Sequence, residues 1–381
     1  MRIAAVLAWV LIFTSACEGE ARSQEQDSDP VYADLTLDQK LQRLYDDDVF
    51  SGTIAVIQND EFIYNKAFGY ADRGSARAND MRTISDIGSI AKTFTAAAVL
   101  KLHESQQLSI DDPLKKHFSA LAKPTASITI RQLLTHKGGM DNFHNETDFD
   151  PMTRAEAERL ILNMPLVAKP GEKTEYSNAA YTLLAIIVER TSGQPFQSYI
   201  EEHLLKPLKL EDTGFYEDKK IDIGRIAKGY GGEASGQTTF ERPLTWALIG
   251  AGGMVSTLAD LQTWMTAIHH DPRVSALKGD LLVEAEMGQW SLGSWASRRI
   301  EGTKVRQMGG STNFGYTALA QSLPEHCTTI LLVLNSYSKE FGPATHHKLA
   351  RKTVIPSFLR ELEGKEAKSC QADLAITRGN Q

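Results

Sequence analysis

Apolar residues along the chain repeat with two different periods, and each period predicts one kind of element. Alternating and β-branched runs predict a hairpin over residues 53–64, turning at Asn59-Asp60, and a core strand at Thr328–Leu334. A further alternating run, Phe314–Leu319, is typical of a paired strand. Apolar runs of helical length or period predict helices at Ile90–Leu102, Thr153–Asn163 and Ala179–Arg190.

The predicted strands lie toward the two ends of the chain, whereas helical patterns dominate residues 116–240. This order predicts an α/β (α+β) fold, in which an antiparallel sheet flanked by helices is interrupted by an inserted, mostly helical lobe. With 381 residues, 42% of them hydrophobic and 23% charged, the chain can bury a large core and form two lobes. A cleft between the lobes is the expected place for a site.

The N-terminus has the pattern of a secretory signal. Met1-Arg2 is followed by an apolar run, Ile3–Phe13, that is too short to span a bilayer, and then by small residues. We expect a signal peptide over residues 1–22, or a lipoprotein signal ending at residue 16 with a lipid on Cys17. The protein is therefore expected to be exported, to the periplasm or to the periplasmic or outer side of a membrane.

After the signal, residues 23–35 form a polar, Asp-rich tether, residues 36–365 the predicted catalytic domain, and residues 366–381 a polar tail. Apart from Cys17, the cysteines are Cys327 and Cys370, which form a disulfide or stay as two thiols. A net charge of −7, without a basic stripe, argues against nucleic-acid binding.

Ser89-Ile90-Ala91-Lys92 opens the first predicted helix and places a nucleophile beside a base. Residues three apart share a helix face, so the Ser89 hydroxyl and the Lys92 amine point the same way. At the first turn, Ser89 lies among backbone N–H groups that favour an oxyanion. Burial must lower the pKa of Lys92 from about 10.4 to near 7 for this amine to accept a proton.

Two further segments add groups to this site. Tyr176-Ser177-Asn178 follows a turn signal, Lys169-Pro170-Gly171, and offers a second proton carrier and an amide. The strand pattern at Lys304–Gly310 ends in Gly309-Gly310, where a ligand can approach the backbone. We expect the N–H groups of Ser89 and Gly310 to form an oxyanion hole.

The order S-x-x-K, Y-x-N and a glycine-containing strand resembles the serine β-lactamase and penicillin-binding protein superfamily. The class C β-lactamase and DD-peptidase branch is the most similar, and this resemblance covers about 310 residues, from near Phe50 to near Leu359. Further segments in family order carry the resemblance, among them Phe68-Gly69-Tyr70-Ala71-Asp72, Leu133-Leu134-Thr135-His136 and Gly252-Gly253-Met254-Val255-Ser256-Thr257.

The resemblance implies a β-lactamase/transpeptidase-like fold and acyl transfer without a metal or an organic cofactor. It makes Ser89 the acylated nucleophile, Lys92 and Tyr176 its proton-transfer partners, Asn178 a ligand of substrate and of Lys92, and Gly310 an oxyanion donor. The expected substrate is a small molecule or peptide: a β-lactam, an ester or a D-amino-acid peptide. The sequence leaves the oligomeric state open.

One position departs from the family pattern. Gln307-Met308-Gly309 stands where the family usually has Lys-Thr-Gly or His-x-Gly, so we expect Gln307 to replace a cation that binds the substrate carboxylate. A neutral donor binds a carboxylate less strongly than a charged one. This departure favours an esterase over a β-lactamase, and it sustains the alternative of a penicillin-binding or cell-envelope binding protein without turnover.

Several other sequence features are interpreted as structural rather than functional. Gly250–Gly253 lacks the preceding strand of a nucleotide loop, and Thr257–Asp260 after it is typical of a helix start. The pairs His269-His270 and His346-His347 are interpreted as surface histidines, because adjacent helical residues diverge by about 100°. His136 is expected to make structural hydrogen bonds, and Asp46–Asp48 to end a helix.

Overall fold

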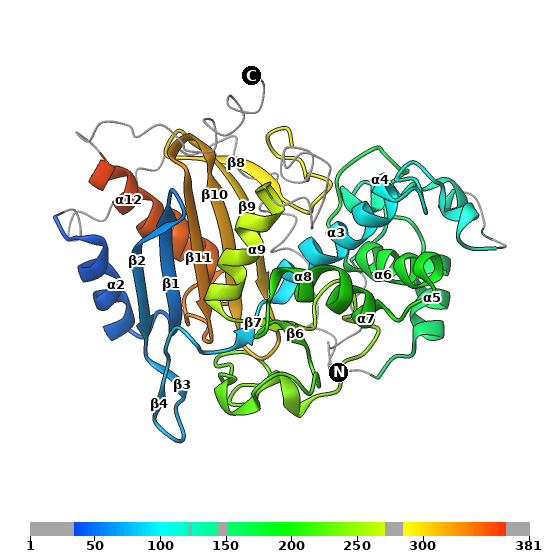
Figure 1. Cartoon of the computed structure of the whole chain (residues 1–381). Coiled ribbons are helices and arrows are strands. Elements are labelled where there is room, and N and C mark those ends of the chain that lie inside the picture. The colour runs from blue at the N-terminus through cyan, green and yellow to red at the C-terminus, as the bar shows by residue number, and fades with distance from the viewer. Residues whose placement is uncertain (1–33, 120, 122–123, 143–150, 271–284, 363–381) are drawn as a thin grey trace, which may run out of the picture.

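The computed structural model describes residues 34–119, 121, 124–142, 151–270 and 285–362 (Figure 1). The predicted signal peptide, Cys17, most of the tether, Cys370, the polar tail and the side chains of His269 and His270 lie outside the described residues. No helix in the described ranges combines the length and apolar character that a membrane span needs.

A six-stranded antiparallel sheet joins the two ends of the described chain, as predicted. Its strand order is β2-β1-β11-β10-β9-β8. The strands are β1 (Gly52–Gln58), β2 (Glu61–Phe68), β8 (Ala296–Ile300), β9 (Thr303–Ser311), β10 (Thr317–Leu323) and β11 (Thr328–Leu334). The predicted hairpin is confirmed as β1 and β2, with Asn59 and Asp60 at positive φ. The predicted core strand is confirmed as β11, which pairs with both β1 and β10.

Helices cover both faces of this sheet. The outer face packs against α2 (Leu37–Asp46), α11 (Thr345–Leu349) and α12 (Ile355–Leu362), through apolar residues that include Leu41, Leu332 and Phe358. The inner face packs against α3 (Ala91–Glu104) and α9 (Leu258–His270). Thr257 accepts a hydrogen bond from the Asp260 backbone N–H at 3.2 Å, so the predicted helix start after Gly250–Gly253 is confirmed.

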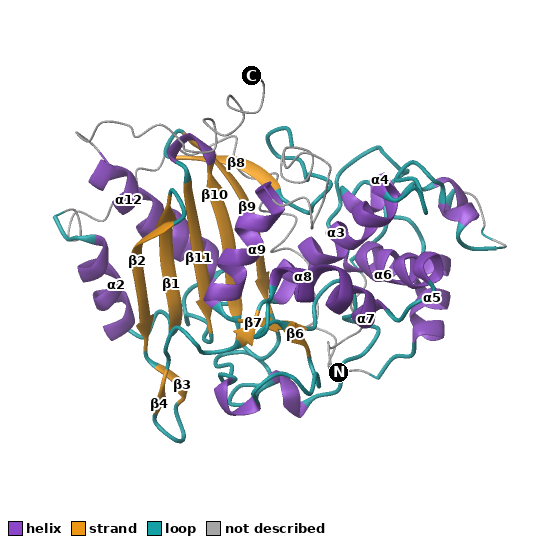
Figure 2. Cartoon of the chain, viewed as in Figure 1, coloured by secondary structure: helices purple, strands orange, loops and turns teal. Residues whose placement is uncertain are grey.

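The helical lobe lies beside the sheet, and Figure 2 shows α4, α5, α6 and α7 gathered on the opposite side of the molecule from β1 and β2. Its helices are α4 (Ile130–Leu134), α5 (Arg154–Asn163), α6 (Asn178–Ser192), α7 (Phe196–Ile200) and α8 (Lys206–Leu208). The predicted helices at 153–163 and 179–190 are confirmed as α5 and α6. Thr153 begins α5 with a capping box, and Gly193 ends α6 with a left-handed φ of 73°.

Short elements complete the fold. The small strands are β3 (Tyr70–Asp72), β4 (Arg77–Ala78), β5 (Ser85–Asp86), β6 (Gly214–Phe215) and β7 (Met254–Ser256). Short 3₁₀ turns lie at Gly88–Ile90, Leu114–Lys116, Thr125–Ser127, Ile223–Arg225, Thr239–Glu241 and Pro324–His326, and π turns at Glu201–Leu205 and Ala350–Val354. The strand order β5-β7-β6 matters for the site, because β5 leads directly into the turn that carries Ser89.

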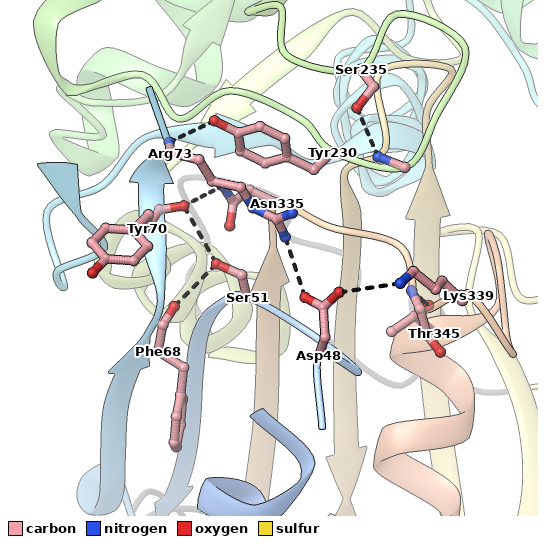
Figure 3. Close-up of polar contacts among 12 residues, drawn as sticks. Asp48, Ser51, Phe68, Tyr70, Arg73, Tyr230, Ser235, Asn335, Lys339 and Thr345 are labelled. Atoms are coloured by element: carbon pink, nitrogen blue, oxygen red, sulfur yellow. Dashed lines mark hydrogen bonds and ion pairs between the residues drawn. The ribbon is translucent and has the colours of Figure 1, made fainter. Parts of the chain in front are cut away.

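A buried polar network fastens one end of the sheet to its neighbouring loops (Figure 3). The side-chain amide of Asn335, which is fully buried, donates to the backbone oxygens of Tyr70 at 3.0 Å and Lys228 at 2.9 Å. Its oxygen accepts from the Asn79 amide at 3.2 Å. Ser51 adds a hydrogen bond to Phe68 O at 3.2 Å. Asn335 therefore joins three chain segments, those of Tyr70, Asn79 and Lys228.

The substitution Asn335→Ala is predicted to lower the free energy of unfolding by about 3 kcal/mol, because the Tyr70 and Lys228 carbonyls and the Asn79 amide each lose a hydrogen bond. Urea unfolding measures this change. Asn65→Ala is the matched control, because Asn65 is an exposed asparagine on β2 of the same sheet. An equal, small effect of both substitutions would contradict the role assigned to Asn335.

The prediction that His346 and His347 lie on the surface is wrong for His346. His346 is only 3% exposed, and its ring lies 4.1 Å from the half-buried ring of His347. Helix α11 packs on the outer face of the sheet at Gly309, where a Cβ would come within 2.7 Å of His346 Nε2. Burial holds the pKa of His346 well below its usual value, and burial, with the Arg298 charge, lowers the pKa of His347 to about 3.

Both histidines are therefore neutral in the folded protein at pH 7, whereas the unfolded chain binds their protons below about pH 6.5. Stability is complete above that pH and falls as the pH drops toward the folded pKa values, by at most about 1.4 kcal/mol per pH unit for each histidine. His346→Leu should reduce the pH dependence of the free energy of unfolding, because the variant takes up about one proton fewer when it unfolds at acidic pH. Urea unfolding at pH 7 and pH 5 tests this, and an unchanged pH dependence would refute it.

Candidate active site

Ser89 lies in the tight turn between β5 and α3. The turn begins at Gly88, whose φ of +50° is left-handed, and continues through Ser89 and Ile90 into α3. Ser89 Oγ lies 3.1 Å from Lys92 Nζ and 2.8 Å from the Tyr176 hydroxyl. The structure thus brings together three of the predicted site residues, as the S-x-x-K spacing and the Tyr-x-Asn segment suggest.

Lys92 has no exposed surface, and a backbone carbonyl and two tyrosine rings surround its amine. Its Nζ donates to Ala251 O at 2.7 Å, besides its contact with Ser89. The same atom lies 5.0 Å from the centre of the Tyr176 ring and 5.7 Å from that of Tyr181. Burial disfavours an ammonium, whereas the two ring faces favour it.

Tyr176 precedes α6 and is a proton donor in this arrangement. Burial raises the pKa of the Tyr176 phenol, although the Ser89 hydrogen bond acts in the opposite direction. At neutral pH the phenol therefore keeps its proton and donates it to Ser89 Oγ. This leaves Lys92 as the better base of the two.

His136 supports Tyr176 from behind. Its Nδ1 accepts the Ser177 backbone N–H at 3.1 Å, which confirms the expected structural hydrogen bond. The ring centre lies 4.6 Å from that of Tyr176 and 4.9 Å from that of Trp290. Burial holds the pKa of His136 well below its usual value, so the ring is neutral.

Asn178 is the first residue of α6 and reaches a partner that sequence reasoning did not find. Its backbone N–H and its side-chain amide both donate to Asn142 Oδ1, at 3.1 and 2.7 Å. Nothing in the local pattern around Asn142 predicts this contact. The expected roles of Asn178 toward substrate and Lys92 stay predictions.

Strand β9 touches the Ser89 turn through backbone alone. A Cβ on Gly310 would lie 2.2 Å from the Ser89 backbone nitrogen, so only glycine fits. Thr312 N–H donates to Tyr316 O at 3.0 Å, and N–H groups alternate between the two edges of an antiparallel strand. The N–H of Gly310 therefore faces β10, whereas that of Ser311 faces the opposite edge. This register favours Ser311, rather than the predicted Gly310, as the second oxyanion donor.

Gln307 lies on the other face of the sheet from Ser89. It stands opposite Gln321 on β10, with the two side-chain amides 2.9 Å apart, and its amide lies near Nδ1 of His347 in α11. With its oxygen turned toward Arg298, the amide accepts from that guanidinium at 3.2 and 3.1 Å. Gly309 shares this outer face, whereas Met308 packs into the inner core. The side chain of Gln307 is thus not placed to replace a carboxylate-binding cation beside Ser89.

A hollow that is partly open to solvent lies beside Ser89. Its walls are Gly88, Ser89, Asn178, Tyr216, Leu248, Ala251, Gly252, Gly253, Ser311, Thr312 and Phe314. These lining residues carry no lysine, arginine or histidine. Within the described residues, no group of three or more His, Cys, Asp or Glu side chains could hold a metal ion.

Comparison with known proteins agrees with this geometry. Residues 37–350 match the Beta-lactamase family. The chain is 32% identical over 219 residues to a putative penicillin-binding protein, PbpX, of Bacillus subtilis, covering 58% of this chain and 55% of that protein. It is 28% identical over 232 residues to a teichoic acid D-alanine hydrolase of Staphylococcus aureus, covering 60% and 57%. The chain thus matches just over half the length of these relatives.

Solved structures share the fold. The D-amino acid amidase of Ochrobactrum anthropi has a TM-score of 0.72 at 21% identity, covering 85% of this chain and 99% of that one. The octameric penicillin-binding protein homologue of Pyrococcus abyssi has a TM-score of 0.71 at 24% identity, covering 88% and 80%. With a family match over most of its length, the chain belongs to the Beta-lactamase family, within the superfamily of serine β-lactamases and penicillin-binding proteins.

Proposed function

We propose that the protein is a serine hydrolase that forms an acyl-enzyme on Ser89. The observation that carries this proposal is the position of Ser89 Oγ between a buried amine and a phenol, at 3.1 and 2.8 Å. A nucleophile within hydrogen-bond reach of a base is the arrangement that covalent acyl transfer requires.

In the first step, neutral Lys92 takes the Ser89 proton while Oγ attacks the substrate carbonyl. The N–H groups of Ser89 and Ser311 stabilise the oxyanion. Tyr176 gives its proton to the leaving group as the tetrahedral intermediate collapses, and the proton held by Lys92 then restores the phenol. In the second step, water loses a proton to the same groups and releases the acyl product.

We propose that the substrate is an ester or amide of a small acyl group, of the D-aminoacyl class. The names of two relatives, a teichoic acid D-alanine hydrolase and a D-amino acid amidase, support this class. Among the residues that the structure describes, the lining of the hollow beside Ser89 carries no cation, which favours such substrates over β-lactams that carry a carboxylate. The alternative of a binding protein without turnover was based on Gln307, but the Gln307 side chain lies on the face of the sheet away from Ser89.

We also propose that the protein is exported. It rests on the N-terminal signal pattern, and the disulfide at Cys327 supports it, because disulfides persist in oxidising compartments. The sequence pattern at Cys17 supports attachment to a membrane through a lipid.

Ser89→Ala is predicted to abolish ester turnover and acyl-enzyme formation, and Lys92→Ala to lower kcat/KM by about a hundredfold or more. Intact mass spectrometry with short-chain p-nitrophenyl esters detects the adduct while product release is followed. Lys40 and Ser357 form a matched control pair, buried on the outer face with a hydrogen bond of 3.1 Å. Lys40→Ala and Ser357→Ala should keep kcat, and a Lys92→Ala enzyme of normal activity would refute the mechanism.

Gln307→Lys is predicted to destabilise the fold by several kcal/mol without improving the site. The new ammonium would be buried beside the Arg298 guanidinium, away from Ser89. We expect a lower urea midpoint and an unchanged ratio of acylation by benzylpenicillin to acylation by a neutral ester. A gain in penicillin acylation would show that residue 307 does reach the substrate.

A further inference from the structure

His136 ends the short helix α4 in a backbone conformation that is usually taken by glycine. Its φ is +55°, and its N–H donates to Leu133 O at 3.2 Å. The N–H of the next residue, Lys137, donates to Gln132 O at 2.7 Å. These two bonds form a Schellman motif, in which glycine is the commonest residue because a left-handed φ disfavours a Cβ. The helix end alone therefore does not require a histidine side chain.

The same residue holds the chain on both sides of Tyr176. Glu175 N–H donates to the His136 carbonyl oxygen at 2.8 Å, and Ser177 N–H donates to Nδ1 of the His136 ring at 3.1 Å. Residues 174–177 belong to no helix or strand, so regular secondary structure does not fix this stretch of backbone. Two hydrogen bonds to one residue thus hold the backbone immediately before and immediately after Tyr176.

The His136 ring also packs against the phenol that its backbone contacts hold. The ring centres of His136 and Tyr176 lie 4.6 Å apart, with 33° between the ring planes. The His136 ring lies 5.1 Å from the ring of Tyr181 and 4.9 Å from that of Trp290, and the whole residue is only 1% exposed. Closely packed rigid rings leave the Tyr176 phenol little room to move away from Ser89.

The Ser177 contact requires the neutral form of the His136 ring. Because Nδ1 accepts an N–H, it carries no proton, and the proton of the neutral ring lies on Nε2. A protonated ring would turn an N–H toward the Ser177 N–H, and this contact would be lost. Burial lowers the pKa of His136 and so keeps the acceptor available. An apolar side chain of similar size would lack this acceptor.

The position of the phenol matters because the proposed mechanism takes the leaving-group proton from Tyr176. The Tyr176 hydroxyl donates to Ser89 Oγ at 2.8 Å. Proton transfer needs heavy atoms within about 3.2 Å of one another, so a shift of the phenol by about 1 Å is enough to impair it. General acid catalysis contributes roughly a hundredfold or more, so even a partial loss can be measured.

We propose that His136 is a positioning residue for acid catalysis, which holds Tyr176 through its Nδ1 acceptor and its main-chain oxygen so that the phenol reaches both Ser89 and the leaving group. This inference rests on the proposed acyl-enzyme function of Ser89. His136 acts through Tyr176 and transfers no proton itself.

The test compares kcat/KM for the phenyl and p-nitrophenyl esters of one short acyl group. Phenolate is the stronger base and gains more from a proton donor than p-nitrophenolate does. His136→Leu removes the acceptor, so the ratio of kcat/KM for the phenyl ester to kcat/KM for the p-nitrophenyl ester should fall at least about tenfold.

His136→Asn is the conservative variant, because its side chain branches like that of leucine but carries an acceptor and tolerates a left-handed φ. It should restore the ratio to within about threefold of that of the unsubstituted protein. If His136→Leu fails to fold, His136→Gln takes its place, because its longer side chain carries the amide beyond the position of Nδ1.

A double-mutant cycle separates positioning from general structural support. Tyr176→Phe removes the phenol, so adding His136→Leu should lower kcat/KM for the phenyl ester by less than about twofold further. A general structural role would give the same loss with and without the phenol. His117→Leu is the matched control, because His117 is a histidine of the same lobe whose side chain is 9% exposed and which does not line the hollow. This variant should keep the ratio.

Three results would overturn the inference: an unchanged ratio in His136→Leu or Tyr176→Phe, equal losses from His136→Leu with and without the phenol, or a His136→Asn variant as impaired as His136→Leu. Acylation of Ser89 in these experiments would leave the proposed hydrolase intact. Turnover of the p-nitrophenyl ester alone would show that the protein has no effective acid, and it too would overturn only the role of His136. No adduct and no turnover with either ester would overturn both proposals.

Discussion

Backbone contact between β9 and the turn that carries Ser89 requires glycine on both sides, at Gly310 and Gly88. A Cβ on Gly88 would lie 2.9 Å from the Ser311 nitrogen, and one on Gly310 would lie 2.2 Å from the Ser89 nitrogen. Gly88 also holds a positive φ, which other residues rarely adopt. The two N–H groups that can share an oxyanion are held together by this contact, because no side chain separates the strand from the turn.

The same contact determines which way the rest of β9 faces. Since Gly310 faces Ser89, strand alternation turns Gly309 and Gln307 toward the outer helices. His346 fills the space that a side chain at position 309 would occupy, and Arg298 and Gln321 surround Gln307. A residue in the sequence motif is therefore not automatically a residue of the site. Whether such a residue belongs to the site depends on the face of the strand from which its side chain projects. On β9 that face is fixed because Gly310 must face the Ser89 turn.

Much of this arrangement could be predicted from local sequence. The hairpin, the core strand, α5 and α6 follow from period and capping residues, and the Ser89–Lys92 contact follows from helix geometry alone. The features that could not be predicted depend on strand register or on contacts between segments that are far apart in the sequence. The choice of Ser311 over Gly310 needs the β9–β10 pairing, and the burial of His346 needs the position of α11 on the sheet. Asn142, Ala251 and Tyr216 reach the site from separate loops, and no spacing links them to Ser89.

Two buried ionisable groups beside Ser89 are held in different ways, and the difference suits different tasks. Ala251 O accepts a hydrogen bond from Lys92 whether the amine is charged or neutral, so this contact lets the amine gain and lose a proton. Asp86 instead accepts from an N–H and an O–H, which both favour only the ionised carboxylate. Lys92 is thereby suited to carry a proton through the reaction, and Asp86 to remain a fixed charge.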